Sequence, residues 1–107
     1  MPTGPRYAVV FAPEVTTHLR AIERKYHAFL RKEIHLRLAF EPDRPTRNRK
    51  PLDIPAPYGA QWELRLGPRN RFRVFYEVVQ GPRAVKIVAI GVKDRVVLRI
   101  GLEEFRQ

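Results

Sequence analysis

The spacing of hydrophobic residues changes partway along the chain, from a helical period in the first half to alternation in the second. Residues 7–11, YAVVF, are apolar and β-branched and predict a short first strand. Pro13 can then open a helix, because its missing N–H would be unpaired at that position in any case. The apolar residues that follow recur at helical spacing: Val15, Leu19, Ile22 and Tyr26.

A second apolar stripe predicts a second helix, which is either hinged to the first near His27 or nearly continuous with it. The stripe consists of Phe29 or Leu30, Ile34 and Leu38. It stops before Pro42 and Pro45, which disfavour helical continuation. Residues 41–60 contain five prolines and predict a connector without helix or sheet of its own.

The second half of the chain has the two-residue period of half-buried strands. Residues 62–66 and 72–78 predict two antiparallel strands joined by a turn at 67–70. The side chains predicted to face the helices are Trp62, Leu64, Leu66, Phe72, Val74 and Tyr76. Residues 84–92 are apolar on both faces apart from Lys86 and predict a central strand. Residues 93–107 fit either a short strand or a helix, followed by a tail.

Together these elements predict an α+β fold in the order β-α-α-β-β-β, with two N-terminal helices packed on one face of an antiparallel sheet. The 107 residues, 44% of them hydrophobic, suit a single small domain over 1–107 with a modest core. The chain has no cysteine, which excludes disulfides and a cysteine nucleophile and favours a reducing cytoplasm. It has no apolar run near the ~20 residues of a membrane span, and we expect no membrane association.

The charge balance points to a polyanionic partner. Lys and Arg number 21 against 11 Asp and Glu, a formal net charge of +10. Such a surface attracts RNA, DNA or an acidic protein. The three histidines, 18, 27 and 35, do not have the spacing of metal ligands on one helical face, so we expect helix-surface histidines and no metal or cofactor.

Alternation along the predicted hairpin places arginines on the face of the sheet away from the helices. That face is predicted to carry Glu63, Arg65, Arg71, Arg73, Phe75 and Glu77. Clustered guanidinium groups repel one another, and their planar forks match phosphate. The alternative is an ordinary solvated face in which Glu63 and Glu77 serve as cross-strand partners.

The motifs resemble those of the RelE/ParE superfamily of toxins from type II toxin–antitoxin systems, and the RelE-like mRNA interferases more closely. The resemblance covers YAVVF, the two helices, KPL at 50–52, WELRLGPRNRFRVFYEV at 62–78 and VKIVAIGVKDR at 85–95. RelE-like members cut mRNA in the ribosomal A site with basic residues and no metal. The resemblance therefore implies a ribosome-dependent endoribonuclease that inhibits translation.

The resemblance also implies roles for individual residues. Arg73 takes the position of the family's phosphate-stabilising arginine, Arg65 that of a lysine, and Lys93 lies close to a basic residue after the last strand's glycine. Glu63 replaces another lysine, and it is either a base or a partner of Arg65 or Arg71. The family's C-terminal catalytic tyrosine has no clear counterpart. We expect further RNA contacts from Arg71, Arg44, Arg47, Arg49, Lys50 and Arg95, with Phe75 stacking on a base.

Two other functions stay open at this point: a ParE-like inhibitor of DNA gyrase, and an inactive toxin-fold partner in an antitoxin–DNA repressor complex. All three share one expected partner, an acidic antitoxin whose disordered segment folds on the helices and sheet, with a possible heterotetramer. The nuclease would in addition bind the ribosome and mRNA.

Overall fold

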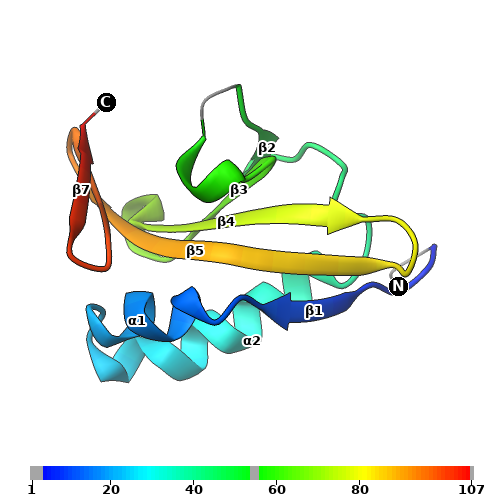
Figure 1. Cartoon of the computed structure of the whole chain (residues 1–107), viewed down its shortest axis with the longest axis horizontal. Coiled ribbons are helices and arrows are strands. Elements are labelled where there is room, and N and C mark those ends of the chain that lie inside the picture. Colours follow the sequence, from blue (N-terminus) through cyan, green and yellow to red (C-terminus); the bar gives the residue numbers. More distant parts are fainter. Residues whose placement is uncertain (1–3, 54–55, 107) are drawn as a thin grey trace.

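The computed structural model describes residues 4–53 and 56–106, which form one mixed sheet with two helices on one side of it. Figure 1 shows α1 and α2 on the same side of β4 and β5. The helices are α1 (Glu14–Arg20) and α2 (His27–Leu38). The strands are β1 (Ala8–Phe11), β2 (Arg49–Pro51), β3 (Trp62–Leu66), β4 (Phe72–Val79), β5 (Ala84–Asp94), β6 (Val97–Ile100) and β7 (Glu103–Arg106).

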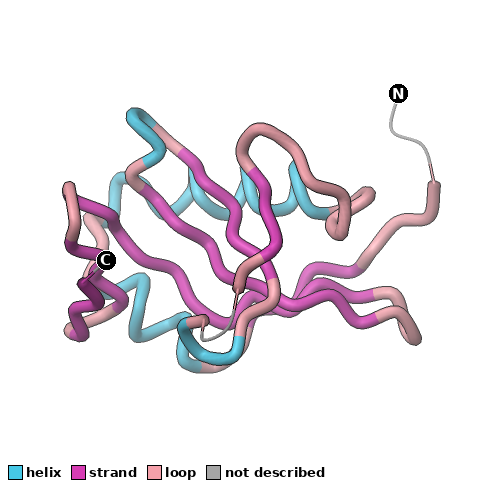
Figure 2. Tube along the Cα trace, turned by 90° about the horizontal axis from the view of Figure 1, so that it is seen from above, coloured by secondary structure: helices cyan, strands magenta, loops and turns pink. Residues whose placement is uncertain are grey.

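The sheet has the order β2-β3-β4-β5-β6-β7, and every pair along this path is antiparallel. The first strand, β1, lies parallel to the beginning of β5, while β6 pairs with the end of β5. Figure 2 shows the β6–β7 hairpin at one end of the sheet. The predicted α+β fold with two helices on one face of the sheet is confirmed, and the sheet is antiparallel as predicted except for the parallel pair of β1 and β5.

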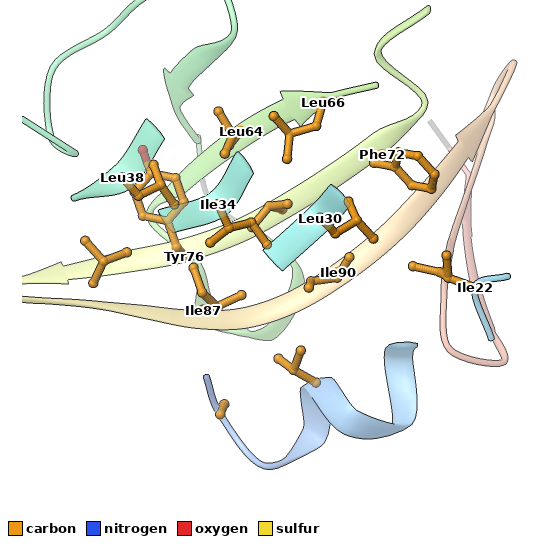
Figure 3. Close-up of a cluster of buried hydrophobic side chains, with 14 of the residues drawn as sticks. Ile22, Leu30, Ile34, Leu38, Leu64, Leu66, Phe72, Tyr76, Ile87 and Ile90 are labelled. Carbon is orange, nitrogen blue, oxygen red and sulfur yellow. The ribbon is translucent and has the colours of Figure 1, made fainter. Parts of the chain in front are cut away.

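The main core lies between α2 and the sheet, as the apolar pattern predicts. Leu30, Ile34 and Leu38 are almost fully buried and lie in a row along α2 (Figure 3). Their partners on the sheet include the predicted inward residues Leu64, Leu66, Phe72, Val74 and Tyr76. Tyr76 satisfies its buried hydroxyl by donating a 2.7 Å hydrogen bond to the carbonyl oxygen of Pro42.

The break between the helices lies earlier than predicted. α1 ends at Arg20, and Glu23 has an extended backbone (φ −53°, ψ 134°) before a 3-10 turn at Arg24–Tyr26. A continuous helix over residues 14–38 would be about 37 Å long, whereas the longest dimension of the molecule is 36 Å. The break lets Val15 and Ile22 reach the same core as α2.

The connector contains a strand that the sequence analysis did not predict. Residues Arg49–Pro51 form β2 at the edge of the sheet against β3, and a 3-10 turn follows at Pro57–Gly59. Pro51 is tolerated because an edge strand needs no N–H donor on its open side. No helix within the described residues has the length and apolar content to span a bilayer.

The end of the chain forms a β-hairpin, β6–β7, which covers part of the face opposite the helices. A second core lies there, formed by Ala60, Phe75, Val88, Ala89, Leu98 and Ile100. Gly91 permits this close cover, because a Cβ atom at this position would lie 2.6 Å from the carbonyl oxygen of Arg99. The face predicted to be an open arginine surface is therefore partly apolar and covered.

Candidate anion-binding site on the sheet

Five charged side chains meet on the face opposite the helices, beside the second core. Arg65 on β3 lies directly opposite Arg73 on β4, which in turn lies opposite Gly91 on β5. Because alternate residues of a strand share a face, Glu63 and Lys93 point to the same side as these arginines. Lys50 on β2 lies opposite Glu63. We call Glu63, Arg65, Arg73, Lys93 and Lys50 the Glu63 cluster.

The carboxylate of Glu63 is buried between two arginines. Only 3% of Glu63 is exposed. The Nε of Arg65 donates a 3.2 Å hydrogen bond to Oε1, and Nη1 of Arg73 lies 3.5 Å from Oε2. The Nε of Arg73 donates to the carbonyl oxygen of Asn70 at 2.9 Å. Both guanidinium groups are therefore held in fixed orientations against the sheet, with 33% of the Arg65 side chain and 10% of the Arg73 side chain exposed.

The electrostatics of the Glu63 cluster favour an anion. Burial lowers the pKa of the Arg73 guanidinium. Attraction to the Glu63 carboxylate raises this pKa by less, and repulsion from Arg65 lowers it again. Burial is also the largest cause of the lowered pKa of Lys93, and repulsion from Arg73 lowers this pKa further. Four cations therefore share a single carboxylate, and a bound phosphate would relieve their mutual repulsion.

Asn70 is a part of this site that the sequence analysis missed. Its backbone has a positive φ of 53°, a conformation that asparagine tolerates better than most residues. This turn directs the carbonyl oxygen of Asn70 toward Arg73. The only signal in the sequence is an asparagine at a predicted turn, which by itself says nothing about a contact with Arg73.

The structure places Arg71 outside the Glu63 cluster, although the alternation predicted it there. Arg71 precedes β4 and has helical backbone angles (φ −71°, ψ −26°), which interrupt the alternation. Its guanidinium carbon lies over the rings of Tyr26 and Phe72, on the helix side of the sheet. The partners of Glu63 are accordingly Arg65 and Arg73, and not Arg71.

Two residues predicted to contact RNA are buried in structural roles. Phe75 is 1% exposed within the second core, which does not fit a free ring stacking on a base. Arg49 faces the helix side, where its Nε donates to the carbonyl oxygen of Arg44 and its Nη1 to that of Arg37. It ties the connector to the C-terminal end of α2.

The other predicted RNA contacts lie at the surface. Arg44, Arg47, Lys50 and Arg95 are exposed. Arg44 pairs with Glu41 at 3.1 Å, and Arg95 lies in the turn after β5 with a positive φ. Of these four, only Lys50 belongs to the Glu63 cluster, in register with Glu63 itself.

One of the histidines is not at the helix surface as predicted. His18 is 4% exposed, and its Nδ1 accepts a 3.4 Å hydrogen bond from the backbone N–H of Ile90. Its ring also packs against Tyr58, whose hydroxyl donates to Glu103. Over residues 4–53 and 56–106 no group of three His, Asp or Glu side chains could hold a metal.

Fold and site together define a class: small α+β proteins with a helical pair on one face of the sheet and a cationic cluster on the other. The chain matches a chain in the crystal structure of the toxin–antitoxin complex RelBE2 from Mycobacterium tuberculosis. The TM-score is 0.68 at 19% identity, and the match covers 87% of this chain and 98% of that chain. No protein-family model and no curated protein matches the sequence. The likeness shows a RelE-like fold, as the sequence motifs predict.

Proposed function

We propose that this chain is the toxin of a toxin–antitoxin pair and that it cleaves mRNA on the ribosome without a metal ion. One observation carries the proposal: Arg65 and Arg73 lie side by side on a RelE-like sheet, each held by the buried Glu63 carboxylate. Two oriented guanidinium forks are suited to a phosphate group, which accepts paired hydrogen bonds.

The chemistry of RNA cleavage explains why cations would be needed here. The ribose 2′-hydroxyl gives its proton to water and its oxygen forms a bond to the adjacent phosphorus while the bond to the 5′-oxygen breaks, which leaves a 2′,3′-cyclic phosphate and a 5′-hydroxyl. Negative charge builds up on the phosphoryl oxygens during this step. Arg65 and Arg73 would stabilise this charge, because arginine stays protonated and acts as a fixed cation. Lys93, whose pKa is lowered, is the better candidate to protonate the leaving 5′-oxygen.

Glu63 would act as a positioning residue in this scheme. Its two carboxylate oxygens face Arg65 and Arg73, and little of the side chain is open to a substrate. It would hold the two arginines in place before the substrate binds, which lowers the cost of ordering them during the reaction. This role explains why an anionic side chain lies within a site proposed to bind an anionic phosphate.

The expected partner is an acidic antitoxin, and the outer face of α2 supports such a partner. A groove of about 700 Å³ lies there, with Arg6, Arg31 and Lys32 beside the apolar side chains of Leu36 and Phe40. Leu36 is 68% exposed. Cations around exposed apolar residues suit a segment that presents both carboxylates and apolar side chains.

Expression of the chain alone, followed by mapping of message ends, tests the proposal. We expect growth arrest and cleaved mRNA, and we expect Arg73→Lys to lower cleavage about 100-fold because the fork is lost while the charge remains. Arg83→Lys is the matched control, since Arg83 is an exposed arginine in the turn before β5. It should cleave like the wild type.

Two outcomes would contradict the proposal, and each would favour a different function. Growth arrest with intact messages, together with inhibition of supercoiling by the purified protein, would indicate a ParE-like gyrase inhibitor. Normal growth with abundant soluble protein would indicate an inactive toxin-fold partner in a repressor complex.

A further inference from the structure

A second cationic site lies at the end of the sheet, on the helix side. A groove of about 220 Å³ opens there between the break that follows α1 and the ends of β4, β5 and β6. Arg71 and Arg99 contribute its cations, and Glu23, Tyr26, Phe72 and Val92 line it beside them. We call it the sheet-end groove. It is separate from the Glu63 cluster, which occupies the opposite face.

Arg71 lies over two aromatic rings in this groove. Its guanidinium carbon lies 5.6 Å from the ring centroid of Tyr26 and 5.3 Å from that of Phe72. A cation is attracted to the face of an aromatic ring, so the two rings position the guanidinium, which keeps N–H donors for an acceptor. The groove therefore presents a positioned cation with hydrogen-bond donors.

Arg99 reaches the same groove from β6. Phe72, Val92 and Arg99 are direct neighbours across β4, β5 and β6, so they form one row on the helix face. The Nε of Arg99 lies 3.3 Å from a carboxylate oxygen of Glu104, and about half of each side chain is exposed. An exposed pair of this kind contributes little stability, so Arg99 can exchange Glu104 for a phosphate at small cost.

The sheet-end groove and the Glu63 cluster meet at the turn between β3 and β4. The Arg73 side chain, in the cluster, donates to the carbonyl oxygen of Asn70. The backbone N–H of Lys93 donates to the carbonyl oxygen of Arg71 at 2.7 Å. Two residues span no more than about 7 Å of chain, so Arg71 and Arg73 lie close on either side of the sheet's end. A nucleic acid strand that rounds this end would meet both sites in succession.

We propose that the sheet-end groove binds a backbone phosphate of the RNA strand, next to the phosphate held by the Glu63 cluster. The inference rests on the proposed function, because it takes the strand at the Glu63 cluster to be RNA. The volume of the groove is below the usual range for drug-sized ligands, ~300–1,000 Å³, and suits a phosphate with its ribose. The groove would hold the strand on one side of the bond to be cut.

The test measures binding of a short 2′-O-methyl RNA over a range of salt concentrations, because this RNA has no free 2′-hydroxyl and cannot be cleaved. We expect Arg71→Gln and Arg99→Gln each to weaken binding several-fold and to reduce the salt slope of log K by about 0.7, the value for one phosphate contact on a single strand. Arg83→Gln removes the same charge elsewhere and should leave the slope unchanged. Melting curves confirm folding, and the exposed Arg99 provides a second variant if Arg71→Gln is unstable.

The outcomes separate this inference from the proposed function. If both variants bind RNA like Arg83→Gln, the groove is not an RNA site, even when the wild type cleaves messages. If the variants show the reduced salt slope while expression of the wild type leaves messages intact, the groove stands as an RNA site and the nuclease proposal fails. Wild-type protein without measurable affinity for the RNA would overturn the groove inference.

Discussion

Single residues at the edge of β5 show how polar groups are satisfied where the sheet is interrupted. On the edge of β5 away from β4, β1 pairs with β5 up to Ile87 and β6 pairs with it from Gly91, so Ile90 has no partner strand on that edge. His18 fills this gap by accepting the N–H of Ile90. A buried N–H without an acceptor would cost about 1–3 kcal/mol. The neutral form of His18 is therefore the one that stabilises the fold.

This role makes stability depend on pH. Burial lowers the pKa of His18, against the opposing attraction to Glu14 and Glu103, while in the unfolded chain the pKa is near 6.5. The stabilisation is complete above the unfolded pKa and is lost as the pH falls toward the folded one, because the unfolded chain binds the proton first. We expect the melting temperature to fall more between about pH 7.5 and about pH 5.5 in the wild type than in His18→Asn. The asparagine oxygen can accept the same N–H but does not titrate, and equal falls in both proteins would contradict the prediction.

The candidate site was predictable where regular strand geometry applies and not where it ends. Arg65 and Arg73 lie within strands, so alternation correctly placed them on one face. Arg71 lies one residue before β4, where a helical backbone turns it to the other side. Phe75 was assigned to the correct face, but the hairpin that buries it comes from distant residues. Local periodicity carries no information about such a contact.

At the scale of elements, the β6–β7 hairpin gives the Glu63 cluster its partly dry surroundings. Leu98 and Ile100 on β6 pack beside Phe75 and Ala89 on the arginine face. Leu98 lies directly opposite Lys93, so the hairpin also limits the access of water to that side chain. The position of β6 therefore influences the chemistry of the site.

The strands that the sequence did not reveal are short and depend on partners far along the chain. β2 has three residues, too few to display a period, and it forms because β3 offers an open edge. β6 and β7 have four residues each and pair mainly with each other and with β5. In contrast, the long apolar run of β5 and the stripe of α2 were predicted because each repeats its pattern several times.

A substitution at Gly91 tests how tightly the β6–β7 hairpin packs against β5. A Cβ atom there would lie 2.6 Å from the carbonyl oxygen of Arg99 and 2.9 Å from Cγ1 of Ile100, so β6 must move away. We expect Gly91→Ala to lower the free energy of unfolding by about 1–3 kcal/mol, as for other overpacked sites. Gly81→Ala is the control for chemical denaturation, because a Cβ atom at Gly81 meets nothing within 4 Å. Equal stability of the two variants would show that β6 is not held tightly against β5.

For the molecule as a whole, the +10 charge is distributed over several surfaces with different roles. Arg49 stabilises the connector, Arg37 pairs with Glu33 on the outside of α2, and the Glu63 cluster gathers cations on the sheet. Net charge alone therefore does not measure affinity for RNA. Only those cations that contact phosphates release counterions and contribute to the salt dependence of binding.

This distinction leads to a prediction for the whole protein. If Arg65, Arg73, Lys93 and Lys50 contact phosphates, these four cations should make log K for single-stranded RNA fall by about 3 for each tenfold rise in salt, and the two arginines of the sheet-end groove should add about 1.4 to that fall. Lys50→Gln should reduce that slope by about 0.7, because Lys50 lies opposite Glu63 in the cluster. Lys86→Gln removes the same charge from β5, where Lys86 lies 4.0 Å from Glu77, and should leave the slope unchanged. Similar losses in both lysine variants would mean that RNA responds to the total charge of the protein, and a wild-type slope near zero would rule out a phosphate-binding sheet.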